Sequence, residues 1–237
     1  MKPHSHADGL SHFLVACFFI YMTVNFYIDG YNFYYGLRAA KNSDAKWCSA
    51  YWIDFVELCR KFLGLEQELG KVVYFTATPF HRDKAARQRA LLKVNKALHP
   101  TEFEVVMGRY LSKKIKCPNC NGWFPRPEEK KTDVNISVRL LGDCMFNATD
   151  RVVLVSADSD LVPPLNFIIQ NFPDKKIRVM FPITLNCKET ISLLHKNSLK
   201  VVFLEKNFAR FKQSVLPDNV VVDGVAYSIP QKWKERL

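Results

Sequence analysis

Short apolar runs alternate with amphipathic stretches along this chain. Six of the runs have the length and the β-branched or aromatic content of strands, and we expect strands at residues 23–28, 71–77, 102–107, 151–156, 176–181 and 199–204. The run at 151–156 is apolar almost throughout, which is typical of a strand buried on both faces. The apolar pattern therefore favours a sheet that is covered on both sides.

The stretches between these runs have helical periodicity. Apolar residues at steps of three and four predict one core-facing helix over residues 44–63, with the stripe Trp47, Tyr51, Phe55, Leu58 and Phe62. Further helices are expected at 81–98, 132–147, 160–171 and 188–195. The helix at 132–147 has an apolar face made of Val134, Val138, Leu141 and Met145. Strands that alternate with helices predict an α/β fold, namely a Rossmann-like three-layer sandwich with a mostly parallel central sheet.

Three segments fall outside this alternation. Residues 1–21 form an apolar N-terminal extension that we expect to be dispensable for the fold; a membrane anchor or an additional docking helix is the alternative. Residues 108–127 are interrupted by prolines and are expected to form a loop. We therefore divide the chain into the extension 1–21, a domain at 22–205 and a basic, loop-rich tail at 206–237.

Charge and cysteine content indicate which kind of partner the protein binds and which cellular compartment it occupies. The chain has 34 Lys and Arg against 23 Asp and Glu, a net charge of +11, which suits a polyanion such as nucleic acid. An anionic membrane surface would also suit this charge. The seven cysteines are an odd number and mostly lie singly in apolar patterns, so we expect free thiols in a reducing compartment, the cytoplasm.

Four aspartates are the main candidates for chemistry. Asp29 follows the first expected strand, Asp158 and Asp160 follow the buried strand, and Asp133 opens the helix at 132–147. Taken singly, each is an ordinary turn or helix-capping residue. If the two strands are neighbours in a parallel sheet, their carboxyl ends meet at one edge. The carboxylates would then form a hard-oxygen site suited to Mg²⁺ or Mn²⁺.

The acidic motifs, taken in order, resemble those of the NYN domain family, a branch of the PIN-like nuclease superfamily. The resemblance is carried by Tyr27-Ile-Asp-Gly-Tyr-Asn-Phe-Tyr, Glu128-Glu-Lys-Lys-Thr-Asp-Val-Asn-Ile-Ser and Val155-Ser-Ala-Asp-Ser-Asp-Leu-Val-Pro. Further similarity at Phe172-Pro-Asp-Lys-Lys-Ile-Arg-Val and Gln213-Ser-Val-Leu-Pro-Asp extends it over about residues 23–235. It implies a PIN-like sheet with a divalent-metal ribonuclease site.

The resemblance also implies a role for each motif residue. Its catalytic acids would be Asp29, Asp133, Asp158 and Asp160, of which the first three would hold one or two Mg²⁺ or Mn²⁺ ions. Asn32 and Ser156 would support these ligands by hydrogen bonds. The implied reaction is endonucleolytic hydrolysis of RNA, which leaves a 5′-phosphate and a 3′-hydroxyl.

Basic and aromatic side chains are the expected contacts to RNA. The expected phosphate-binding set is Arg38, Arg82, Arg87, Lys113, Lys114 and Lys130, for which a solvated surface is the alternative. Bases could stack on Tyr31, Phe33, Tyr34 and Trp123, for which core packing is the alternative. The oligomeric state stays open, and a homodimer is compatible with the sequence.

The cysteine pair in the expected loop raises the question of zinc. Cys117 and Cys120 supply half of a zinc site. Cys48, Cys187 and His99 are available as partners, but no spacing favours any of them. A loop hairpin with two reduced thiols is the alternative.

Two other functions compete with a nuclease. A non-catalytic RNA-binding or regulatory module would use the basic surface without turnover. A phosphatase of the haloacid-dehalogenase type would need an Asp-x-Asp motif after the first strand, where this chain has Asp29-Gly-Tyr-Asn32. No Gly-x-Gly-x-x-Gly or Walker-type loop is present, so the sequence gives a nucleotide cofactor no support.

Overall fold

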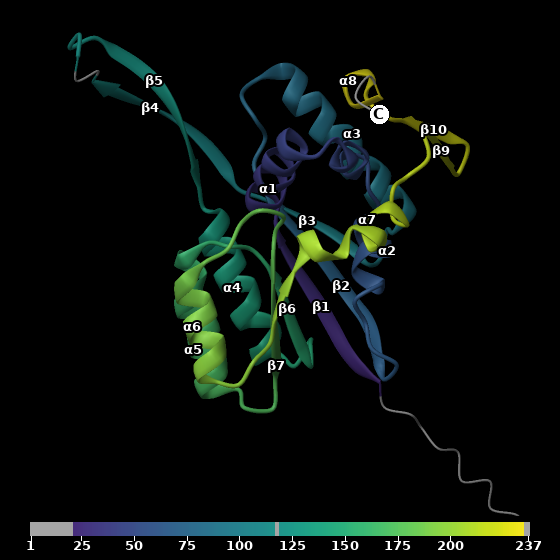
Figure 1. Cartoon of the computed structure of the whole chain (residues 1–237), viewed down its shortest axis with the longest axis vertical. Helices are drawn as coiled ribbons and strands as arrows, with labels where there is room; N and C mark the ends of the chain where they lie inside the picture. The colour runs from purple at the N-terminus through teal and green to yellow at the C-terminus, as the bar shows by residue number, and fades with distance from the viewer. Residues whose placement is uncertain (1–20, 117–118, 235–237) are drawn as a thin grey trace, which may run out of the picture.

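A six-stranded parallel sheet forms the centre of the protein (Figure 1). The computed structural model describes residues 21–116 and 119–234, so most of the expected N-terminal extension lies outside the described residues. The strand order is β3-β2-β1-β6-β7-β8, with bounds β1 (Met22–Asp29), β2 (Gln67–Thr76), β3 (Phe103–Met107), β6 (Arg151–Val155), β7 (Lys176–Phe181) and β8 (Val201–Phe203). The predicted α/β sandwich is confirmed, and every pairing in this sheet is parallel.

Alternating side chains along the central strands bury two separate helical layers. In β1, Phe26 and Ile28 join one hydrophobic cluster while Tyr27, between them, joins the other. The first layer contains α1 (Gly30–Ser43), α2 (Phe55–Arg60), α3 (Arg82–Leu98) and α7 (Phe208–Lys212). The second layer contains α4 (Thr132–Met145), α5 (Val162–Asn171) and α6 (Lys188–Lys196), as Figure 1 shows.

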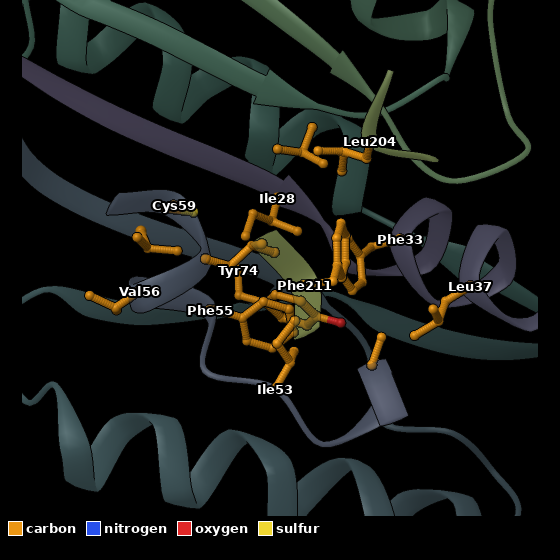
Figure 2. Close-up of a cluster of buried hydrophobic side chains, with 14 of the residues drawn as sticks. Ile28, Phe33, Leu37, Ile53, Phe55, Val56, Cys59, Tyr74, Leu204 and Phe211 are labelled. Carbon is orange, nitrogen blue, oxygen red and sulfur yellow. The ribbon is translucent and has the colours of Figure 1, made fainter. Parts of the chain in front are cut away.

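Aromatic packing fixes α1 and the C-terminal segment against the sheet (Figure 2). The Phe33 ring of α1 lies 5.4 Å from Phe55 of α2 and 6.1 Å from Phe211 of α7, measured between ring centroids. Trp233 is also buried in this cluster. The expected loop-rich tail is therefore wrong in its local structure: it contains α7, a hairpin of β9 (Asn219–Val222) and β10 (Val225–Ser228), and α8 (Gln231–Lys234).

The helix expected over residues 44–63 is interrupted. Its first part is a 3₁₀ helix, η1 (Ala45–Tyr51), and α2 begins only at Phe55. Between them, Ile53 forms a β-bridge with Val215, and the Asp54 N–H donates to the carbonyl oxygen of Ser214 at 2.8 Å. Pairing with this distant segment breaks the helix, although all five residues of the predicted apolar stripe are buried. The helix α1, which precedes it, was not predicted.

Residues 108–127 also depart from expectation, because they are mostly strand. β4 (Arg109–Lys116) and β5 (Trp123–Lys130) form an antiparallel hairpin that projects from the end of the sheet (Figure 1). Pro125 and Pro127 pair with Lys114 and Ser112. A two-stranded hairpin has two free edges and so tolerates prolines that an interior strand would not. Their presence explains why the segment resembles a loop in sequence.

α4 buries a different face from the one its aliphatic stripe indicates. Val134, Val138 and Met145 are exposed, while Ile136 and Leu140 pack under the helix against the sheet. No helix in the part of the chain that the structure describes is long and apolar enough to cross a bilayer.

Candidate metal centre

Asp29 lies where β1 ends and α1 begins, and its carboxylate is held by four donors. Oδ1 accepts the backbone N–H groups of Tyr31 at 3.1 Å and Asn32 at 3.0 Å. Oδ2 accepts the Asn32 amide at 2.6 Å and the Ser156 hydroxyl at 2.8 Å. Two of these bonds are helix capping, as expected of an aspartate at this position. Burial nevertheless raises the pKa of Asp29 above its ordinary value, against the lowering effect of these hydrogen bonds.

The topology places the end of β6 directly beside the end of β1. Ile28 pairs with Val155, and the strand order of the sheet reverses between these two strands. After β6, Ser156 bonds to Asp29, and the Ala157 N–H donates to Asn32 Oδ1 at 3.2 Å. Ser156 and Asn32 therefore tie the two strand ends together through hydrogen bonds.

Three of the four candidate aspartates converge at this edge. One carboxylate oxygen from each of Asp29, Asp133 and Asp158 lies within 4.8 Å of the other two. Asp133 comes from the first turn of α4, and Asp158 caps the short 3₁₀ helix η2 (Ser159–Leu161). Asp160 lies in η2 outside the cluster and is exposed. Asp29 thus meets two acids that lie more than a hundred residues further along the chain.

The electrostatics of the cluster are those of a site that lacks compensating charge. The pKa of Asp133 is raised to about 6, first by burial and then by the negative charges of Asp158, Asp29 and Asp160. Within residues 21–116 and 119–234, no Lys or Arg forms an ion pair with Asp29, Asp133 or Asp158. Grouped carboxylates without a cation need either a proton or a metal ion, and oxygen ligands of this kind fit a hard divalent cation.

The residues expected to contact RNA are only partly brought together. Arg38 on α1 and Arg87 on α3 line one cavity, Arg82 and Lys130 are exposed elsewhere, and Lys114 is exposed on the hairpin. The side chain of Lys113 lies outside the described part. Among the aromatics, Tyr31 and Tyr34 line a cavity, Phe33 is mainly core, and Trp123 is exposed on β5.

Sequence reasoning missed four further residues that line the cavity of Arg38 and Arg87. They are Lys41 on α1, Tyr51 on η1, and Lys232 and Trp233 on α8. For Lys232, the only signal in the sequence is the basic character of the final residues.

The proposed zinc partners are engaged elsewhere. His99 Nε2 lies 2.8 Å from Asp54 Oδ2, and Cys48 and Cys187 are buried in or beside the hydrophobic clusters. Cys120 is exposed with a free thiol, and Cys117 lies outside the described residues. Zinc binding by Cys117 and Cys120 therefore stays a prediction.

Comparison with known sequences agrees with the fold and the acidic edge. The NYN domain family matches residues 23–180, which include all four aspartates. The chain belongs to the NYN domain family. This membership suggests a PIN-like nuclease, a class of hydrolase that acts on nucleic acid.

Two individual proteins show how far the similarity reaches. The chain is 27% identical over 192 residues to 6-hydroxy-3-succinoylpyridine 3-monooxygenase HspA of Pseudomonas putida, a match that covers 66% of this chain and 58% of that protein. The chain thus spans a little over half the length of this curated relative. A protein of unknown function from Vibrio parahaemolyticus has a similar fold, with a TM-score of 0.52, 20% identity, and coverage of 80% of this chain and 96% of that one.

Proposed function

We propose that this protein is a divalent-metal-dependent endoribonuclease. One observation carries the proposal: carboxylates from β1, α4 and the segment after β6 meet within 4.8 Å. Their charge is not offset by an ion pair in the part of the chain that the structure describes. The family assignment supports the same class of chemistry.

Asp29, Asp133 and Asp158 would hold Mg²⁺ or Mn²⁺ at the edge of the sheet. The bound cation would supply Lewis-acid chemistry, which makes water a stronger acid and offsets charge on the scissile phosphate. Ser156 and Asn32 would keep the Asp29 carboxylate in one orientation through their hydrogen bonds. Asp160, outside the cluster, would add negative charge beside Asp133 and act as an auxiliary acid.

RNA is the proposed substrate because the acidic cluster lies in a strongly basic chain. The net charge of +11 favours association with a polyanion. Arg38 and Arg87, which line one cavity, and Lys114 on the hairpin would bind backbone phosphates. We place the activity in the cytoplasm, since the five cysteines of the described residues are all free and four of them are buried.

The decisive experiment measures cleavage of labelled single-stranded RNA and of the matching DNA in Mg²⁺, Mn²⁺ or EDTA. Asp158→Asn should reduce RNA cleavage by at least about a hundredfold while leaving the circular dichroism spectrum unchanged. Asp174→Asn is the matched control, because Asp174 is exposed and follows the C-terminal end of α5, whereas the cluster lies before the N-terminal end of that helix. Cleavage that survives both EDTA and Asp158→Asn would refute the metal mechanism, and RNA binding without cleavage would favour the non-catalytic module.

A further inference from the structure

A cavity of about 300 Å³ is lined in part by Gly30 and Tyr31, the two residues that follow Asp29 of the acidic cluster. It is formed by α1, η1, α3, α8 and the carboxyl end of β2, and in Figure 1 these helices gather at one end of the sheet. Its volume is at the lower end of the range for pockets that bind small molecules. The cavity is therefore large enough for one small group but not for a helix or a duplex.

Aromatic rings dominate the wall of this cavity. They form a continuous series from the acidic cluster outwards: Tyr31, Tyr35, Tyr34, Tyr51 and Trp233. Successive ring centroids lie 4.3, 5.3, 6.0 and 5.7 Å apart. Tyr34 and Tyr35 also carry hydroxyl groups, so the wall offers both ring faces for stacking and polar groups for hydrogen bonds.

A second cavity, of about 220 Å³, continues from the first and is basic. The two share Tyr34, Tyr51, Arg87 and Trp233. The second adds three cations, Arg38 on α1, Lys41 on the same helix and Lys232 on α8. No acidic residue is among the described residues that line it.

Among the residues that the structure describes, these four cations are without a carboxylate partner. None of Arg38, Lys41, Arg87 and Lys232 forms an ion pair within residues 21–116 and 119–234. Arg38 and Lys41 instead lie over the rings of Tyr35 and Tyr51, at 5.8 and 5.9 Å from the centroids. Positive groups held together without a counter-charge form a site for an anion.

One helix orders the two cavities relative to the metal centre. The Tyr31 N–H donates to Asp29 Oδ1, and Tyr31 also lines the aromatic cavity. Further along α1, Tyr34, Arg38 and Lys41 follow at steps of three and four, which places them on one face of the helix. This face presents first the acidic cluster, then aromatic rings, and then cations.

We infer that the two cavities form a subsite for one nucleotide, with the unpaired base among the aromatic rings and its phosphate on the four cations. Its place next to the scissile bond rests on the proposed nuclease function, whereas nucleotide binding itself does not. A base must leave a duplex to enter the cavity, so the preferred substrate is single-stranded RNA. An apolar peptide would leave the basic cavity without an anion, and an isolated anion would leave the aromatic cavity empty.

The test measures binding apart from cleavage, by calorimetry on the full chain in EDTA. The probes are AMP, adenosine, inorganic phosphate and nicotinate. Nicotinate is a planar aromatic anion without ribose or phosphate, and it tests whether the cavities bind such an anion in preference to a nucleotide. AMP should bind at least about tenfold more tightly than adenosine or phosphate, because stacking and charge contacts then act together. Tyr34→Ala and Arg87→Ala should each weaken AMP binding about tenfold. Arg38→Ala should act in the same direction and is safer for the fold, because Arg38 is exposed.

Arg89→Ala is the matched control, since Arg89 is exposed on the same helix as Arg87 and lines neither cavity. AMP binding should be unchanged in this variant. The inference is wrong if AMP does not saturate the wild-type protein, if Arg38→Ala and Arg87→Ala bind it normally, or if nicotinate binds more tightly. Specific AMP binding in a protein that cleaves no RNA would uphold the subsite and refute the nuclease.

Discussion

The Ser156 hydroxyl donates to Asp29 Oδ2 at 2.8 Å, so the segment after β6 holds a carboxylate at the end of β1. The same oxygen, Ser156 Oγ, accepts the Asp158 N–H at 3.0 Å. One buried hydroxyl therefore touches two of the three clustered aspartates, and it fixes their separation without contributing a carboxylate itself.

Replacing Ser156 by alanine tests this positioning role. Ser156→Ala should leave the fold intact but lower Mn²⁺ affinity by roughly tenfold or more, as is usual when a residue that orients a metal ligand is lost. Isothermal titration with Mn²⁺ measures the effect. Ser159→Ala, an exposed serine three residues away, provides the control and should bind Mn²⁺ normally. Equal affinity in Ser156→Ala and the wild type would show that the hydroxyl does not organise the site.

The raised pKa of Asp133 predicts that the metal-free protein loses stability as pH rises. The pKa of Asp133 is about 6 in the folded state and near 3.8 when unfolded. The folded state therefore holds the proton more tightly, which contributes stability that is fully present below pH 3.8 and is lost as pH rises through 6. Asp133→Asn should therefore be more stable than the wild type at pH 7.5. We expect about 1 kcal/mol, after discounting for solvent screening of a partly exposed group.

Urea denaturation in EDTA at pH 4 and pH 7.5 measures the stability difference between Asp133→Asn and the wild type. The difference should be small at pH 4 and grow by pH 7.5. Added Mn²⁺ should stabilise the wild type more than the variant, because a ligand that binds only the folded state raises its stability. A stability difference that does not change with pH would mean that burial and the neighbouring carboxylates do not raise the pKa of Asp133.

The strands and the acidic edge were predictable because both depend on local chemistry. The run at 151–156 is apolar enough to require burial on both faces, and it forms the central strand β6. Asp29 and Asp158 were expected to meet because each follows a strand, and they do so beside the reversal of strand order. The rule that sites form beyond the carboxyl ends of parallel strands was sufficient to predict where these two aspartates meet.

The features that sequence reasoning missed depend on contacts between distant segments. The break before α2 is made by pairing of Ile53 with Val215, which no local pattern reveals. The basic cavity is completed by Lys232, about two hundred residues from Arg38, through packing of Trp233 against Tyr51. α1 was missed because the Asp29-Gly30 pair resembles a turn, whereas Asp29 caps a helix that begins at Gly30.

Gly30 itself is required by close packing rather than by its backbone angles. A Cβ at this position would lie 2.5 Å from Tyr74 Cε1 and 2.7 Å from the carbonyl oxygen of Phe75. Gly30→Ala should cost about 2 kcal/mol of unfolding free energy, because the buried Tyr74 ring must move. Gly142→Ala in α4 is the control: nothing lies within 4 Å of its added Cβ. That variant should gain up to about 1 kcal/mol, since alanine is the better helix former. Two equal results in urea denaturation would contradict the packing argument.

A buried polar network lies towards the C-terminal end of α4, whereas Asp133 is in its first turn. Substitutions in this network therefore test stability separately from metal binding. Asp143 Oδ2 accepts the Tyr27 hydroxyl at 2.7 Å, and Arg139 bonds to both Asp143 and Glu104. Asp143→Ala should cost about 3 kcal/mol, because it leaves buried donors without their acceptor. Tyr27→Phe should cost only about 1 kcal/mol, the usual net value of one hydrogen bond.

Neither substitution should change Mn²⁺ affinity. Arg139, the network residue nearest to Asp133 along α4, is about 9 Å away in helical rise, and Asp143 is about 15 Å away. Among the described residues, no hydrogen bond joins these network side chains to the three clustered aspartates. A double-mutant cycle in urea should give a coupling energy between Tyr27 and Asp143, because the two side chains are in contact. Titration of each folded variant with Mn²⁺ completes the test. A tenfold loss of affinity in Tyr27→Phe would contradict this separation and show that the network is coupled to the acidic cluster.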